Sequence, residues 1–157
     1  MARKYKSTER FLLPDARHDS MLATKFIHCL MQKGKKSIAQ SIFYDALGVI
    51  ATKVKETDPI EVFNQALANV KPLVEVRSKR VGGATYQVPR EVPKKRQVAL
   101  SMRWIIEGVR SKKGRPAHLK LADELIAAFR KEGAAIAKRE NTHRMAEANK
   151  AFAHFSW

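Results

Sequence analysis

The sequence contains very little cysteine. Cys29 is the only one among 157 residues, so an intrachain disulfide is impossible and the cysteine pairs of a zinc site are missing. This composition is typical of a protein in a reducing compartment, and the cytoplasm is the expected location. Because Cys29 lies in an apolar helical stretch, we expect a buried and inert thiol.

Long apolar runs are also lacking. No segment approaches the roughly 18 apolar residues that a membrane-spanning helix needs. The first residues, MARKYKSTERFLLPD, lack the apolar centre of a secretory signal. We therefore expect no membrane association. We interpret residues 1–17 as a basic N-terminal arm, disordered without its partner, which precedes a single domain over residues 18–157.

Acidic residues are scarce. The chain has 15 Asp and Glu against 31 Lys and Arg, a formal net charge of +16. Such a charge disfavours a compact state unless a polyanion neutralises it. Residues 1–40 are net +6 and residues 71–120 net +11, whereas residues 41–70 are net −2 and residues 121–157 net +1. This segregation indicates a positive face that binds a phosphate backbone.

Patterns that support catalysis are absent. The residues GKKS at 34–37 match the end of a nucleotide-binding P-loop, but Cys29 stands where that loop needs a glycine, and a helix precedes it rather than a strand. Glu140 and His143 form one Glu-x-x-His pair, whereas a di-iron centre needs two such pairs and two further carboxylates. We therefore predict no enzyme activity, no catalytic residue, no cofactor and no metal site.

A hairpin pattern occupies about residues 73–89. Side chains along residues 73–79 alternate between the two faces of a strand. Gly82 and Gly83 supply the positive φ angles of a tight turn, and the same alternation of side chains resumes on the return strand. A basic ribbon of this kind is suited to nucleic acid. Tyr86 has two open interpretations, an aromatic ring that stacks on an unpaired base and an ordinary hairpin residue.

Six helical segments surround this hairpin. Hydrophobic periodicity and turn residues place them from Asp19 to Gly34, from Ser37 to about Lys55, from Pro59 to about Val70, from Pro93 to about Arg110, from Pro116 to Gly133, and from Ala134 to near the end. The last helix is expected to carry Met145, Phe152 and Phe155 on one side, with Trp157 docked on the core or on a neighbour. The expected fold is mainly α, a six-helix core with one protruding β-hairpin inserted between the third and fourth helices.

Several residues have specific expected roles in these helices. Asp58 is the expected N-cap of the third helix, with Pro59 at its first position. Ser37 is the expected cap of the second helix, and Ile38 is expected to face inward. Trp104 lies among apolar residues in mid-helix, so we place it in the core.

The first turn of the fourth helix is electrostatically unusual. Lys94, Lys95 and Arg96 lie at the positive end of the helix macrodipole, which is unfavourable for cations. A bound phosphate would reverse the sign, because free backbone N–H groups and cations together bind anions. We therefore interpret this turn as a site for an external anionic partner.

Three motifs together resemble a known family. They are KFIHCLMQKGKKSIA at 25–39, PLVEVRSKRVGGATYQVP at 72–89 and HRMAEANKAFAHFSW at 143–157. In this order and with these separations they are similar to the bacterial-type small-subunit ribosomal protein seven family over almost the whole chain. That family usually has tyrosine near the position of His18 and arginine at the position of Ser156, so the contacts of those two side chains are not inferred.

The resemblance implies a structural, primary RNA-binding role. It implies binding to the 3′ major domain of small-subunit (16S) ribosomal RNA and nucleation of the subunit head. It also implies that the hairpin and the terminal helix approach exit-site tRNA and the mRNA path, with small-subunit proteins nine and eleven as neighbours.

Charge and resemblance together define two sets of candidate site residues. The ribosomal-RNA set comprises Arg3, Lys4, Lys6, Arg10, Lys35, Lys36, Lys94, Lys95, Arg96, Lys112, Lys113 and Arg115. The set expected near tRNA and mRNA comprises Arg77, Lys79, Arg80, Val81, Gly82, Gly83, Tyr86, His143 and Arg144. The alternative is an architectural DNA-binding protein, since basic ribbons also enter the minor groove.

Overall fold

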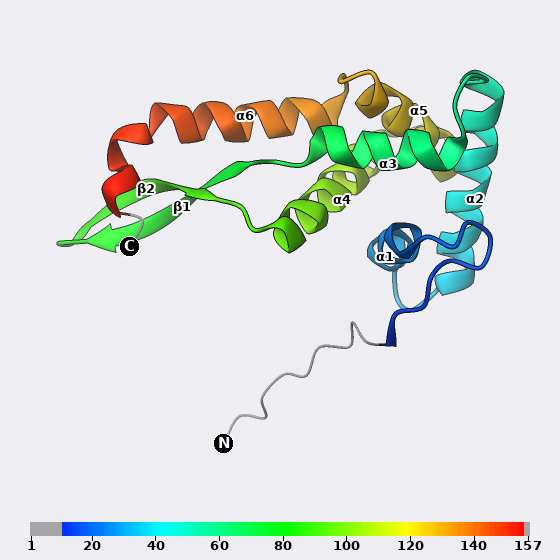
Figure 1. Cartoon of the computed structure of the whole chain (residues 1–157), viewed down its shortest axis with the longest axis horizontal. Helices are drawn as coiled ribbons and strands as arrows, with labels where there is room; N and C mark the ends of the chain where they lie inside the picture. Colours follow the sequence, from blue (N-terminus) through cyan, green and yellow to red (C-terminus); the bar gives the residue numbers. More distant parts are fainter. Residues whose placement is uncertain (1–10, 156–157) are drawn as a thin grey trace.

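The computed structural model describes residues 11–155 and consists of helices with one β-hairpin (Figure 1). The elements in chain order are α1 (Met21–Leu30), α2 (Lys36–Lys53), α3 (Pro59–Val70), β1 (Val74–Val81), β2 (Ala84–Glu91), α4 (Lys94–Ser111), α5 (Ala117–Phe129), α6 (Ala134–Ala148) and the 3₁₀ helix η2 (Lys150–Phe155). The predicted fold class is confirmed, with the hairpin between the third and fourth helices. None of the described helices combines the length and apolarity needed to span a bilayer.

Side chains cap the starts of α1 and α3. The Asp58 side chain accepts a hydrogen bond from the Ile60 backbone N–H at 3.1 Å, and Pro59 occupies the first turn, which confirms the expected start of α3. The expected Ser37 cap is wrong. The helix α2 already begins at Lys36, because left-handed Lys33 (φ 50°) and Gly34 (φ 75°) turn the chain into the helix before Ser37 is reached.

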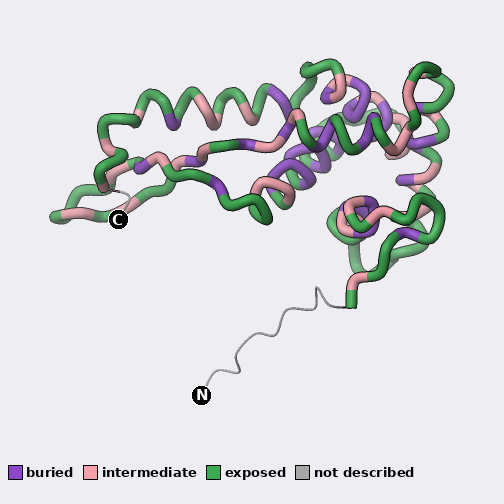
Figure 2. The backbone as a smooth tube through the Cα atoms, in the orientation of Figure 1, coloured by how far each residue is buried: buried purple, intermediate pink, exposed green. Residues whose placement is uncertain are grey.

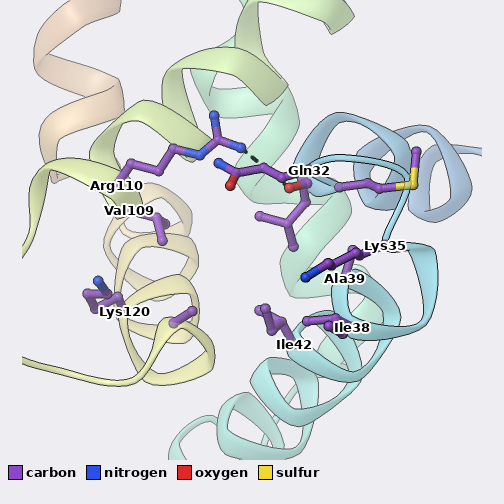
Figure 3. A pocket seen from close by; sticks show the side chains of 11 residues that line it. Gln32, Lys35, Ile38, Ala39, Ile42, Val109, Arg110 and Lys120 are labelled. Carbon is purple, nitrogen blue, oxygen red and sulfur yellow. Dashed lines mark hydrogen bonds between the residues drawn. The ribbon is translucent and has the colours of Figure 1, made fainter.

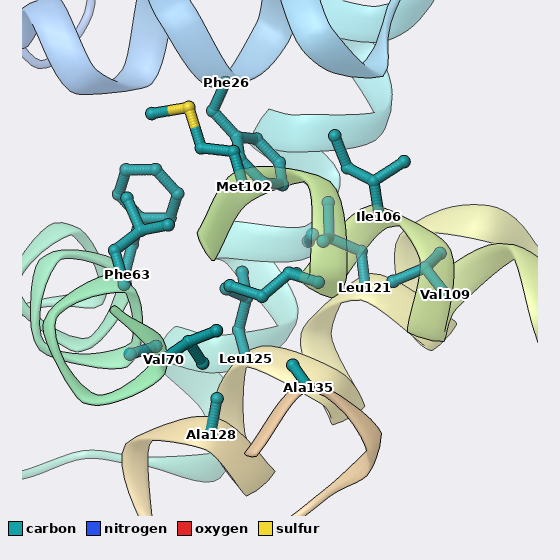
Figure 4. Close-up of a cluster of buried hydrophobic side chains, with 14 of the residues drawn as sticks. Phe26, Phe63, Val70, Met102, Ile106, Val109, Leu121, Leu125, Ala128 and Ala135 are labelled. Atoms are coloured by element: carbon teal, nitrogen blue, oxygen red, sulfur yellow. The ribbon is translucent and has the colours of Figure 1, made fainter. Parts of the chain in front are cut away.

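The core is built around an aromatic cluster. Phe26, Phe43 and Phe63 from the first three helices pack with ring centroids 5.2 to 5.7 Å apart, partly edge to face. Figure 4 shows Leu121 and Leu125 of α5 among the buried side chains contributed by the surrounding helices. One contiguous apolar core therefore holds α1 to α5 in fixed relative positions.

Two expectations for the core have opposite outcomes. Trp104 is buried, as predicted. The expectation that Ile38 faces inward is wrong, since 54% of this residue is exposed. The buried stripe of α2 instead runs through Ala39, Phe43 and Ile50, so Ile38 falls on the adjacent helical row and faces solvent.

The hairpin has the predicted turn. Val81 pairs with Ala84 across a two-residue turn in which Gly82 and Gly83 have φ angles of 58° and 88°. Two successive positive φ angles are typical of the type I′ turn, whose twist matches that of the strands. The hairpin projects from the helical core, and Figure 2 shows that its tip is exposed.

Helix α6 lies along the hairpin and ties it to the core (Figure 1). The His143 Nε2 atom accepts a hydrogen bond from the Leu73 backbone N–H at 3.1 Å, and the Arg139 guanidinium donates to the Asn69 carbonyl. These contacts fix the segment that leads into β1. The hairpin therefore extends from the core with support along its root.

The end of the chain differs from the continuous helix that the sequence predicts. The α-helix ends at Ala148, and η2 brings the chain back onto the hairpin. The rings of Phe152 and Phe155 lie 5.3 and 5.2 Å from that of Tyr86, whereas Met145 is exposed and does not share their side. Packing against the hairpin thus outweighs continued α-helix formation. Trp157 lies outside the described residues.

The described part of the predicted N-terminal arm, residues 11–17, contacts the helical core. Asp15 is buried and accepts a hydrogen bond from the Tyr44 hydroxyl at 2.5 Å. The Arg17 guanidinium lies 4.2 Å from the centre of the Tyr44 ring, a cation–π contact. These two contacts attach this segment to α2.

Candidate nucleic-acid interface

Three acid-free stretches of the sequence contain helices of the core. They are residues 20–44, 92–106 and 108–122, which hold α1, the start of α2, most of α4 and the first part of α5. The helices α1 and α4 pack against each other in the core. Acid-free segments from the two basic blocks of the sequence are thereby brought together in space.

The α1–α4 contact carries a surface groove with cations on both walls. The groove has a volume of about 550 Å³ and includes Lys25 and His28 from α1, and Lys94, Lys95 and Met102 from α4. The predicted pair Lys94 and Lys95 is therefore joined by Lys25. Sequence reasoning missed Lys25, although its position in an acid-free helix was a usable signal.

Cys29 lies at the edge of this groove and is exposed, so the prediction that it is buried is wrong. It occupies the α1 row that faces the groove rather than the row of Phe26, which faces the core. The neighbouring side chains still remove water from the thiol, and this desolvation raises its pKa although Arg103 opposes the change. The thiol is therefore protonated at neutral pH.

A second hollow lies farther along the same two helices. It has a volume of about 290 Å³ and is lined by residues of α1, α2, α4 and α5, including Lys35, Arg110 and Lys120 (Figure 3). The Arg110 guanidinium donates a hydrogen bond to the Leu30 carbonyl at 3.4 Å, which bridges the ends of α4 and α1. Lys36, next to Lys35, instead borders a third hollow beside residues 11–16.

The cations along this line form what we call the basic face. It comprises Lys25, Lys35, Lys94, Lys95, Arg103 and Arg110. Lys25 and Lys35 come from the first basic block, and the other four come from the second. The two blocks therefore share one surface, as a continuous phosphate-binding face requires.

Among the described residues of the predicted RNA-binding set, Arg96, Lys112 and Arg115 form ion pairs with carboxylates of the chain. Arg96 pairs with Glu75, Lys112 with Glu124 and Arg115 with Asp123, at 2.8, 2.6 and 2.9 Å. The unfavourable position of Arg96 in the first turn of α4 is thus offset by a carboxylate of the hairpin.

The Glu75 carboxylate is nearly buried. Burial favours its neutral form, but hydrogen bonds from Arg96 and then Arg77 outweigh this effect and hold the pKa of Glu75 below its ordinary value. The same carboxylate therefore joins the hairpin root to the start of α4. Arg96 and Arg77 both have a structural role here.

Glu124 organises the other end of α4. Its side chain is fully buried, and its Oε1 accepts a hydrogen bond from the Ala135 backbone N–H at 3.1 Å. A Cβ at Gly108 or Gly133 would lie 3.0 or 3.2 Å from this Oε1. The two glycines therefore make room for the carboxylate that positions Lys112. Sequence reasoning missed Glu124, since nothing in its local pattern distinguishes it from an exposed helical glutamate.

The other predicted ribosomal-RNA residues fall into two groups. Lys113 is exposed in the loop between α4 and α5, and Lys36 is exposed at the start of α2. Arg3, Lys4, Lys6 and Arg10 lie outside the described residues.

The hairpin residues divide between its tip and its base. Arg80, Val81, Gly82 and Gly83 form the projecting end. Arg144 is exposed on α6. A partner approaching the tip would meet Arg80 and the two turn glycines first.

Other predicted hairpin residues are engaged inside the molecule. The Lys79 ammonium donates to the Phe155 carbonyl at 2.9 Å, and Arg77 pairs with Glu75 at 3.0 Å. The Tyr86 ring packs on the rings of Phe152 and Phe155 in η2, so Tyr86 has a structural role within the chain. Burial and then Arg139 lower the pKa of His143, which keeps its ring neutral as an acceptor for the Leu73 N–H.

Metal chemistry has no support in the part of the chain that the structure describes. There, no three His, Cys, Asp or Glu side chains gather at a spacing that could hold an ion. Glu140 of the Glu-x-x-His pair instead lies 3.6 Å from Arg139. The geometry is that of a binding surface with fixed cations.

Comparison with known proteins agrees with this geometry. Residues 2–150 match the family described as ribosomal protein S7p/S5e. The chain is 64% identical to the small ribosomal subunit protein uS7 of Rhodopirellula baltica, over 96% of this chain and 97% of that protein. It is 51% identical to the protein of that name from Desulfotalea psychrophila over the full length of both, and 54% identical to that from Thermotoga maritima over 99% of each. The chain therefore belongs to the ribosomal protein S7p/S5e family, whose members are structural, non-enzymatic constituents of the small ribosomal subunit.

Proposed function

We propose that the basic face is the main surface through which this protein binds small-subunit ribosomal RNA. The observation that carries the proposal is the convergence of Lys25 and Lys35 with Lys94, Lys95 and Arg110 along two packed helices. A rigid array of cations neutralises phosphates of RNA segments that otherwise repel one another, and so lets them converge on one protein. Its place is the small ribosomal subunit in the cytoplasm.

The proposed RNA target is the 3′ major domain of the 16S ribosomal RNA, and the proposed role is nucleation of the subunit head. Family membership supports this target. So does the rigid core, because α1 and α4 both pack into one contiguous apolar core and cannot shift independently. Recognition depends on RNA shape and unpaired bases, since side chains do not enter the deep major groove of A-form RNA.

The proposed role of the hairpin is contact with exit-site tRNA and the mRNA path. Its tip is exposed and cationic, its root is held by Glu75 and His143, and η2 packs on Tyr86 nearer the tip. This construction presents Arg80 and the two turn glycines at a fixed distance from the core. Small-subunit proteins nine and eleven are the proposed protein neighbours.

A salt titration tests the proposal. Each neutralised phosphate releases counterions, so with roughly 6 to 10 contacts the log–log slope of affinity against salt is expected to be about −5 to −9. Filter binding of the full chain to the 3′ major domain RNA gives this slope. A slope near zero contradicts the proposal.

The same assay separates RNA from DNA as the target. An architectural DNA-binding protein would prefer duplex DNA over structured RNA of equal length at one salt concentration. We expect the 3′ major domain RNA to displace the DNA. Displacement in the opposite direction would favour the DNA-binding alternative.

A further inference from the structure

The hollow at the end of the basic face is more apolar than phosphate binding requires. Leu30, Ile42 and Val109 are among the residues that line it, and the exposed Ile38 borders its opening. Cations alone suffice to hold phosphates, and an apolar surface beside them contributes nothing to that contact. An apolar hollow next to phosphate-binding groups matches a nucleotide, whose base is flat and apolar on both faces.

The polar groups at the rim have complementary roles. Lys35, Arg110 and Lys120 supply positive charge, and no acidic residue lines the hollow. Arg110 is held by its hydrogen bond to the Leu30 carbonyl, and the Lys120 ammonium by one to the Lys112 carbonyl at 2.9 Å. Figure 3 shows these cations around the apolar side chains, with Gln32 beside Arg110.

Two of these groups favour a base over other occupants. A guanidinium plane stacks on a nucleobase, and Arg110 presents one at the rim. The amide of Gln32 both donates and accepts hydrogen bonds, which suits the edge of a base. The hollow is small, with a volume of about 290 Å³. This holds a single base, whereas a helix of a partner protein, about 10 Å across, needs a far longer groove.

We propose that one unpaired base of the bound ribosomal RNA inserts into this hollow. Lys35 and Lys120 hold the phosphates that flank it, Arg110 stacks on the base, and Gln32 contacts its polar edge. The inference rests on the proposed RNA-binding function and adds to it a site that selects for an unpaired nucleotide. It therefore explains how a face made of cations can distinguish one RNA fold from another.

The test combines a protein variant in which a side chain fills the hollow with a set of RNAs that each lack one base. Ala117→Phe places a ring in the hollow from the start of α5 and leaves every cation in place. Ala51→Phe makes the same change at an exposed position of α2 outside the hollow and is the matched control. Each protein is titrated with 3′ major domain RNAs that carry one abasic nucleotide at successive unpaired positions.

We expect one abasic position to weaken binding of the wild-type chain and of Ala51→Phe by about 5- to 150-fold, the effect of one stacked base. The same abasic RNA should bind Ala117→Phe no more weakly than intact RNA does. A second measurement uses the wild-type chain and does not depend on the folding of Ala117→Phe. The fluorescent base 2-aminopurine, placed at the sensitive RNA position, should change its emission when the protein binds. At neighbouring RNA positions its emission should stay the same.

Other outcomes overturn the inference, each in a recognisable way. Tight, salt-dependent binding with no sensitive position leaves the proposed function intact and refutes base insertion. Unchanged RNA binding by Ala117→Phe, together with lost incorporation of a neighbouring protein into reconstituted subunits, would mean that the hollow holds an acidic peptide instead. Absence of salt-dependent RNA binding refutes both the proposed function and this inference.

Discussion

Lys112 and Lys113 are adjacent in the sequence, yet the structure gives them different roles. The Lys112 ammonium lies 2.6 Å from Glu124 Oε2, and the Glu124 side chain is fully buried. Lys113 is exposed in the following loop. We expect Lys112→Met to destabilise the fold and Lys113→Met to leave its stability almost unchanged.

The magnitude follows from the surroundings of this ion pair. A hydrogen bond to a charged group contributes roughly 1.5–3 kcal/mol. The Lys112 side chain is 42% exposed, so solvent screening reduces the contribution to about 1–2 kcal/mol. For a chain of this length, that corresponds to a fall in Tm of roughly 2–8 °C. Removing Lys112 also leaves the buried Glu124 carboxylate without this cation, although the Ala135 N–H still donates to it, and this adds to the cost.

Thermal unfolding of the two variants, followed by circular dichroism, measures the difference. Lys113→Met should melt within about 2 °C of the wild-type chain, because surface substitutions change stability by about 0.5 kcal/mol or less. Glu124→Gln combined with Lys112→Met should recover part of the loss, since it removes the uncompensated buried charge. Equal melting of Lys112→Met and Lys113→Met would refute the structural role of this pair.

Three further predictions concern RNA binding, the hairpin and pH. Replacing Lys94 and Lys95 by glutamine should reduce the salt slope for 3′ major domain RNA by about 2, about 1 for each lost phosphate contact. The control is Lys138→Gln, because Lys138 lies outside the basic face and pairs with Glu107. It should leave the slope unchanged, and equal slopes for the two variants would count against the basic face. Deleting residues 80–84 at the hairpin tip should leave affinity for isolated head RNA unchanged and alter the binding of tRNA or mRNA to reconstituted subunits. Loss of head-RNA binding would contradict the separate roles proposed for the basic face and the hairpin. Arg96 and Arg77 lower the pKa of Glu75, so the contribution of Glu75 to stability is fully present above its unfolded pKa near 4.5 and is lost as pH falls through its folded pKa. The difference in Tm between the wild-type chain and Glu75→Gln should therefore disappear in acid. A difference in Tm that does not change with pH would exclude the ion pair as its cause.

The elements of this fold were predictable from local signals. The Asp58-Pro59 start of α3 and the Gly82-Gly83 turn depend on chemistry within a few residues, and both are confirmed. Trp104 was assigned to the core from its apolar neighbours alone. Local patterning decides such features because the hydrogen bonds and φ angles involved do not depend on distant segments.

Contacts between distant segments were not predictable in this way. The exposure of Ile38 depends on which helical row of α2 faces α5, and the exposure of Cys29 on where α4 crosses α1. The end of α6 is set by aromatic packing against Tyr86, about sixty residues earlier in the chain. Each of these features is decided by tertiary packing, which outweighs local propensity.

The candidate site shows the same division. Charge segregation predicted a positive face, but it could not identify the cations that lie on that face. Arg96, Lys112 and Arg115 are paired with acids 8 to 21 residues away in the sequence. The basic face therefore depends on the arrangement of helices α1 and α4, not on the density of lysine and arginine in any one segment.

Lysine footprinting tests the central claim most directly. The full chain is acetylated with and without bound 3′ major domain RNA, and the modification of each lysine is read by mass spectrometry. We predict strong protection of Lys25, Lys35, Lys94 and Lys95 in the complex. The controls are Lys53 and Lys138, which pair with Asp123 and Glu107 outside the basic face, and their reactivity should be unchanged. Equal reactivity of the four basic-face lysines with and without RNA, in a complex shown to form, would contradict the account.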